Sequence, residues 1–106
     1  MATSFTNATA RAVGTTEVIV FTAPQKSIII GCSVTNLTSG TLPIVIKVRN
    51  GVTDTYWAKD KRIDSGEPLE LMKGNKLVLA AGEKLVVSSA IDSSMDVVLS
   101  VLQGVS

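Results

Sequence analysis

The chain has 106 residues and a formal net charge of +1; hydrophobic residues make up 45% of it and aromatic residues only 4%. This length accommodates one domain, and the composition is that of a folded chain with an aliphatic core. No long run of one charge sign appears, and the nearest thing to a basic cluster, Lys59, Lys61 and Arg62, is interleaved with Asp60 and Asp64, so the sequence shows no nucleic-acid surface. The absence of histidine excludes Ser-His-Asp triads and histidine metal ligands.

Residues 1–14 are small and polar, and their hydrophobic positions show no periodicity. Two interpretations fit this stretch: a flexible tail, or an arm that becomes ordered against a neighbouring subunit. Phe5 and Val13 are the apolar side chains with which an arm would anchor itself. The chain therefore divides into a flexible or assembly arm over residues 1–14 and a single β-sandwich domain over residues 15–106.

Eight short strands are predicted after the arm, because β-branched and aliphatic residues alternate with polar ones between clusters of turn residues. A turn is expected at Lys73-Gly74-Asn75-Lys76. No stretch shows convincing helical periodicity, so the predicted fold is all-β, an antiparallel β-sandwich of jelly-roll or Ig-like type. The strands cover residues 16–21, 27–36, 44–49, 52–59, 69–71, 77–79, 85–87 and 95–102.

Two of these strands carry specific local signals. Asn50-Gly51 favours a two-residue type I′ turn, which would pair residues 52–59 with residues 44–49 as a hairpin. Within residues 27–36, alternation places one set of side chains on the core face, and Gly31 indicates a bulge or a close approach of another backbone. That core set is Ile28, Ile30, Cys32 and Val34.

The last two strands are predicted to form a second hairpin, with residues 85–87 paired to residues 95–102 through a connection at 91–94. In the final strand one face is apolar, and Val98 and Leu102 lie on the opposite, only partly polar face. Apolar residues on both faces need cover on both sides, from another sheet or from another subunit.

The residues offer little chemistry. Cys32 is the single cysteine, so it forms no intrachain disulfide, and it is expected to behave as a small buried hydrophobic residue. The carboxylates fall in predicted turns or at outward strand positions, so we expect no catalytic pair, metal site, cofactor or small-molecule substrate. The N-terminus lacks a signal-peptide pattern, and no apolar run is long enough to cross a membrane.

Tyr56 and Trp57 lie on opposite faces of the strand over residues 52–59. The two rings would form a small glycan-binding patch if both were exposed, but Trp57 is more simply interpreted as packed in the core or under a loop. Surplus apolar surface and an N-terminal arm are typical of subunit interfaces. Among an enzyme, a glycan-binding module and a structural assembly protein, the sequence favours the assembly protein.

The order of motifs between residues 27 and 102 resembles small virion structural proteins of tailed bacteriophages. It runs from V-T-N at a strand end through a strand pair around N-G and a connection with G-E-P-L to K-L-V-L-A-A-G-E-K-L-V-V-S-S and S-M-D-V-V-L-S-V-L. The resemblance implies a β-sandwich present in many copies on the particle, with neither catalysis nor cofactor. It also implies a homo-oligomer in the virion, assembled in the host cytoplasm and bound to the major capsid protein or to other virion proteins.

A capsid decoration (cement) protein is the first function that the resemblance implies. A neck, collar, tail or fibre-attachment component is the alternative, and a glycan-binding module comes third. Apolar side chains on the arm and on the strand faces are expected to supply the contacts. The candidate interface residues are Phe5, Val13, Trp57, Val98 and Leu102.

Overall fold

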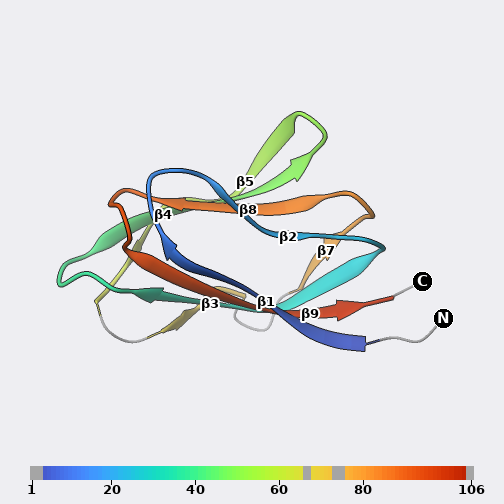
Figure 1. Cartoon of the computed structure of the whole chain (residues 1–106), viewed down its shortest axis with the longest axis horizontal. Coiled ribbons are helices and arrows are strands. Elements are labelled where there is room, and N and C mark those ends of the chain that lie inside the picture. The colour runs from blue at the N-terminus through green and yellow to red at the C-terminus, as the bar shows by residue number, and fades with distance from the viewer. Residues whose placement is uncertain (1–3, 66–67, 73–75, 105–106) are drawn as a thin grey trace.

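A computed structural model describes residues 4–65, 68–72 and 76–104, and within them the regular structure is entirely β-strand. Two antiparallel sheets form two layers (Figure 1), which confirms the predicted all-β sandwich. Most of the turn expected at residues 73–76 lies outside the described residues. The strands are β1 (Ser4–Val13), β2 (Val18–Thr22), β3 (Ser27–Asn36), β4 (Leu42–Asn50), β5 (Thr53–Ile63), β6 (Leu69–Glu70), β7 (Leu77–Leu79), β8 (Lys84–Ser89) and β9 (Met95–Gln103).

The strand order identifies the sandwich as a jelly roll. One sheet has the order β1-β9-β3-β6, with β7 also paired to β3, and the other has the order β2-β8-β4-β5. The pairs are nested, since β4 pairs with β5, β3 with β6 and β7, β2 with β8, and β1 with β9. Nested pairs of this kind arise when one long hairpin is rolled into two sheets. An Ig-like sandwich would place the first two strands side by side, whereas β1 and β2 belong to different sheets.

The core lies between the two sheets and consists almost entirely of aliphatic side chains from alternate strand positions. Ile44 and Ile46 of β4 and Val97 and Leu99 of β9 are completely buried. This alternation follows from the two-residue period of a strand, which directs every second side chain to the same face.

In β3 the first half of the predicted core set is wrong. Ile29 is buried, while Ile28 is half-buried and Ile30 is exposed. A shift of register between Ile29 and Gly31 against β9 changes the alternation at this point, as a bulge does by inserting one residue. The bulge expected at Gly31 is therefore confirmed, and the second half of the set is buried as predicted: Cys32 and Val34.

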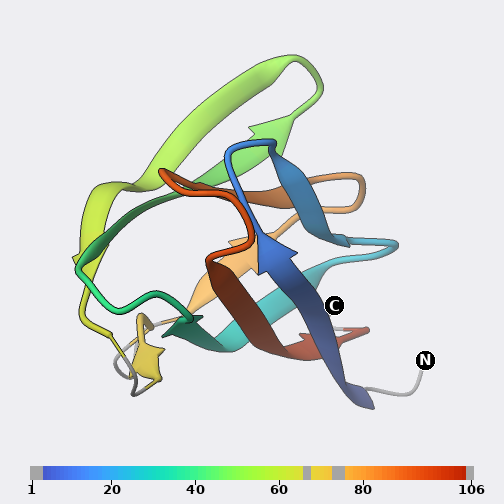
Figure 2. The same cartoon turned by 60° about the vertical axis from the view of Figure 1, so that its left-hand side comes forward.

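The β4–β5 hairpin is confirmed, and its tip stands out from the body of the sandwich (Figures 1 and 2). Its turn differs from the prediction by one position. Asn50 pairs with Thr53, so Gly51 and Val52 are the central residues, and of these only Gly51 has a positive φ, of 61°. Positive φ at the first central residue alone is the type II′ pattern, which matches strand twist as well as type I′ does.

The stretch expected as a flexible or assembly arm contains strand β1, residues 4–13. This strand pairs with β9 of the same chain in unbroken register from Ser4–Gln103 to Ala10–Val97. Ala10 is buried, and Ala8 packs against the core. Because alanine adds little hydrophobicity, this alternation is too weak to recognise in the sequence. A role of β1 in assembly stays a prediction.

The predicted hairpin of residues 85–87 with residues 95–102 is wrong. β8 pairs with β2 and β4 in one sheet, while β9 pairs with β1 and β3 in the other. Residues 90–94, which we call the crossing segment, therefore pass from one sheet to the other, as Figure 2 shows. The hydroxyls of Ser89 and Ser94 at its two ends are buried and lie 2.7 Å apart.

The crossing segment is held to the end of β1 by long-range hydrogen bonds. The Ser89 amide donates to the Gly14 carbonyl over 2.9 Å, and the Ser94 amide donates to the Val13 carbonyl over 3.0 Å. The Asp92 carboxylate accepts from the Thr15 hydroxyl over 2.9 Å, across 77 positions of the chain. Because these partners are distant in sequence, local turn signals in residues 91–94 do not distinguish this crossing from a hairpin.

Candidate assembly surface

An apolar row crosses the outer side of the sheet that contains β1, β9, β3 and β7. Phe5 pairs with Leu102, Leu102 with Ile28, and Ile28 with Val78. Directly opposed residues of neighbouring antiparallel strands place their side chains on the same face. Phe5 is 76% exposed and Val78 is 51% exposed, while Leu102 and Ile28 are half-buried. The row is therefore open to a partner.

Val98 and Ile30 are further exposed apolar side chains on this sheet, and Ser100 of β9, paired with Asn7 and Gly31, separates Val98 from the row. The exposed fractions of Val98 and Ile30 are 43% and 37%. The cross-strand partners of Val98 are Thr9 and Ser33, which are uncharged. We call this surface the apolar face; it comprises Phe5, Ile28, Ile30, Val78, Val98 and Leu102.

Three of the five predicted interface residues, Phe5, Val98 and Leu102, lie together on the apolar face. Val13 does not, because it is 1% exposed and belongs to the core. Trp57 lies in the other sheet, on β5, and packs against the core, whereas its neighbour Tyr56 is 52% exposed. Sequence reasoning therefore locates part of the surface.

Sequence reasoning misses the other three members of the apolar face, Ile28, Ile30 and Val78. Unbroken alternation through β3 would place Ile28 and Ile30 in the core. Gly31 is the available signal for the bulge that turns them outward. Val78 lies on a strand of only three residues, which is too short for alternation to orient it.

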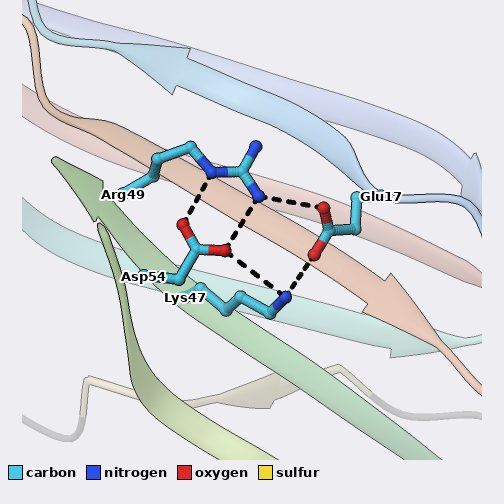
Figure 3. Close-up of polar contacts among 4 residues, drawn as sticks. All are labelled: Glu17, Lys47, Arg49 and Asp54. Atoms are coloured by element: carbon cyan, nitrogen blue, oxygen red, sulfur yellow. Dashed lines mark hydrogen bonds and ion pairs between the residues drawn. The ribbon is translucent and has the colours of Figure 1, made fainter. Parts of the chain in front are cut away.

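The outer face of the other sheet carries a network of four charged side chains, which we call the ion-pair network (Figure 3). Arg49 donates to Asp54 from Nε over 2.7 Å and from Nη2 over 2.9 Å, and it also donates to Glu17 over 2.9 Å. Lys47 donates to Glu17, and its ammonium lies 3.6 Å from Asp54. Glu17 precedes β2, so the network joins that segment to the β4–β5 hairpin.

The ion-pair network is electrically balanced and satisfied internally. Hydrogen bonds from Lys47 and then from Arg49 hold the pKa of Glu17 below its usual value, and the bond from Arg49 lowers the pKa of Asp54. The carboxylates in turn raise the pKa values of Lys47 and Arg49. All four groups are thus charged at neutral pH. The two positive charges balance the two negative ones, so the network as a whole has no net charge.

The single cysteine is chemically quiet. Burial raises the pKa of the Cys32 thiol to about 12, and the negative charge of Glu70 adds to this increase. The Glu70 carboxylate is held in place because it accepts hydrogen bonds from the amides of Cys32 and Met72, over 2.8 and 2.9 Å. A thiol with so high a pKa is a poor nucleophile, and the prediction of a small buried hydrophobic residue is confirmed.

The described residues also contain no group of three or more His, Cys, Asp and Glu side chains arranged to hold a metal ion. None of the described ranges forms a helix with the length and hydrophobicity needed to span a membrane.

Comparison with known proteins finds a likeness in fold. No protein-family model matches the sequence, and no curated protein matches it. Two solved structures of a pentameric capsid protein isolated from metagenomic phage sequences, one of them solved by iodide phasing, match with TM-scores of 0.50 and 0.49. Both are 15% identical to this chain; 93% of this chain is covered, against 60% and 62% of theirs. The chain thus spans about three fifths of their length.

Proposed function

We propose that this chain is a non-enzymatic structural protein of a bacteriophage virion. Within that class we propose a capsid decoration (cement) protein, which forms a homo-oligomer and binds the assembled particle in many copies through the major capsid protein. The protein is then a component of the virion, assembled in the host cytoplasm.

The observation that carries this proposal is the apolar face of the jelly roll. Phe5 and Val78 at the two ends of the row are more than half exposed, and contiguous apolar surface of this kind marks contacts with other proteins. A structural subunit has a use for such a surface.

Three further observations support the virion assignment. The jelly roll is a fold that viral capsid domains use, and one of the similar structures, with a TM-score of 0.50, is that of a pentameric phage capsid protein. The order of motifs along the chain also resembles small phage virion proteins. Trp57 packs against the core, so its position gives the glycan-binding alternative no support.

The test is binding to phage capsids that lack the protein. Added protein is expected to sediment with the capsids, and Val98→Asp is expected to lose at least about tenfold in affinity because a charge would be buried at the contact. Ile19→Asp is the matched control, since Ile19 is 48% exposed on the opposite sheet. Sedimentation with tails but not with capsids would replace decoration by the neck or tail alternative. Equal binding by both variants would contradict the proposal that the apolar face makes the contact.

A further inference from the structure

Each sheet has two edges, and three of the four edges are protected against pairing with another chain. β5 carries the charged run of residues 59–62 and has a positive φ of 52° at Asp60 and two shifts of register against β4. β2 is five residues long and changes register between Ile19 and Phe21. At the far edge of the other sheet, β6 and β7 have two and three residues. Charges, bulges and short strands all prevent edge pairing.

The fourth edge, β1, has such protections only at its end, where Arg11 carries a charge, Ala12 has a positive φ of 52° and the register shifts between Ala10 and Val13; residues 4–10 lack them. Residues 4–10 read S-F-T-N-A-T-A, with no charge and no proline, and they pair with β9 without a bulge. Among the described strands, β9 is the one to which this stretch is paired. In an antiparallel strand every second residue directs its N–H and C=O away from that partner. One side of β1 therefore presents a row of free backbone donors and acceptors.

We propose that β1 pairs antiparallel with β1 of a second copy of this chain, about a two-fold axis at Asn7. The two sheets would then join into one continuous sheet. This inference deepens the proposed homo-oligomer, on which it rests, by naming the strand through which two copies meet.

The identity of the partner follows from the other edges. A regular stretch of seven residues needs an edge of similar length and regularity, and among the described strands β2, β5, β6 and β7 do not supply one. Pairing about Asn7 places Phe5 opposite Thr9 of the second copy, and Arg11 lies beyond the paired stretch. No like charges face each other, which favours this register.

The same pairing extends the apolar face across the axis. Phe5 stands on the outer side and is 76% exposed. Its new neighbour, Thr9 of the second copy, pairs with Val98 on that same outer side. The apolar faces of the two copies would then lie side by side, and together they would present a larger surface to the particle.

The register is tested by cysteine cross-linking in the full chain. Opposed residues of an antiparallel pair have Cα atoms about 4.5–5.5 Å apart, within the range of a disulfide. Asn7→Cys is therefore expected to give a covalent dimer under mild oxidation. Thr9→Cys is the matched control on the same exposed face of β1, because its copies would lie roughly 13 Å apart along the strands and cannot be bridged. The native Cys32 is buried and does not interfere.

A second variant tests the contact without oxidation. Asn7→Lys places two like charges against each other at the axis, so the mass in solution by light scattering is expected to fall to a smaller species. Asn50→Lys, an exposed position on the distant hairpin, is expected to leave the mass unchanged. Circular dichroism checks that each variant is folded.

The outcomes separate the two proposals. A covalent dimer from Asn7→Cys alone, with a loss of mass in Asn7→Lys, supports the β1 contact. The β1 contact is overturned if the protein is an oligomer whose mass is unchanged by Asn7→Lys and which does not cross-link at residue 7. The proposed homo-oligomer then still stands. A protein that stays monomeric at every concentration tested, and also when capsids are added, overturns both proposals.

Discussion

Gly14 marks the point where the chain leaves β1 and meets the crossing segment. A Cβ at this position would lie 2.9 Å from the Asp92 Cα and 3.1 Å from the Ser93 amide nitrogen. Both of these atoms belong to the backbone, so neither can rotate away. The absence of a side chain at Gly14 is therefore a condition for the two crossings between the sheets to pack together.

Gly14→Ala is expected to lower the free energy of unfolding by about 1–3 kcal/mol, the usual cost of overpacking a rigid contact. Gly40→Ala is the matched control, because a Cβ there would meet no atom within 4 Å, and it should change stability by less than about 0.5 kcal/mol. Urea denaturation of both variants measures the difference. Equal effects would show that the Gly14 contact has no energetic weight.

Cys32 should be almost inert in the folded protein. Because burial raises its pKa to about 12, the thiolate fraction at neutral pH falls by roughly three orders of magnitude relative to an ordinary cysteine. Reaction with a disulfide reagent is expected to be correspondingly slower in buffer than in concentrated urea. Similar rates in the two conditions would mean that β3 is not buried as described.

Among the elements, the β4–β5 hairpin depends most on electrostatics. Its tip stands out from the sandwich, and the ion-pair network ties the strand ends next to that tip to the segment before β2. Glu17 and Asp54 have lowered pKa values, so their contribution to stability is complete above the usual carboxyl range. It is lost as the pH falls through the lowered values. The raised pKa values of Lys47 and Arg49 make their contribution complete at neutral pH, with loss only at strongly alkaline pH.

Glu17→Gln is therefore expected to lower the melting temperature at pH 7, by a difference that narrows as the pH falls through the lowered pKa of Glu17. The difference at pH 7 should shrink in high salt, because the network is partly exposed and salt screens it. Asp60→Asn, which removes a carboxylate outside the network and tolerates positive φ, is the control. A pH-independent difference for Glu17→Gln would indicate lost packing instead of lost charge.

The sequence predicts where the strands lie better than it predicts which strands pair with each other. Alternation locates the strands other than β1 within a few residues, and Asn50-Gly51 identifies the hairpin that is closed by local chemistry. Gly31 indicates the bulge but not its effect on Ile28 and Ile30. Alternation alone therefore predicts that these two members of the apolar face lie in the core. Local signals at the crossing segment predict a hairpin. The hydrogen bonds that distinguish a crossing between sheets from a hairpin are made with the Val13 and Gly14 carbonyls, far away in the chain.

For the molecule as a whole, β1 is an integral strand. Ala10 and Val13 are buried in the core. The Val13 and Gly14 carbonyls accept the backbone hydrogen bonds that hold the crossing segment. Deleting residues 1–13 is therefore expected to abolish the cooperative thermal transition, because one edge of the core would be open and the crossing unsupported. Phe5→Ser, at an exposed position of the same strand, should keep the transition. A stable truncated domain would show that β1 is a detachable arm after all.

The place of β9 between β1 and β3 has a consequence for synthesis on the ribosome. β1 pairs with β9 from Ser4–Gln103 onward, and β3 also pairs with β9. Neither strand can complete its ladder until the last strand has emerged, so one sheet forms only after translation has passed residue 103. Contacts so distant in sequence make folding slow, on the order of milliseconds to seconds. During that interval the uncharged stretch of β1, residues 4–10, has no partner, and nascent chains made close together would be prone to pair through it.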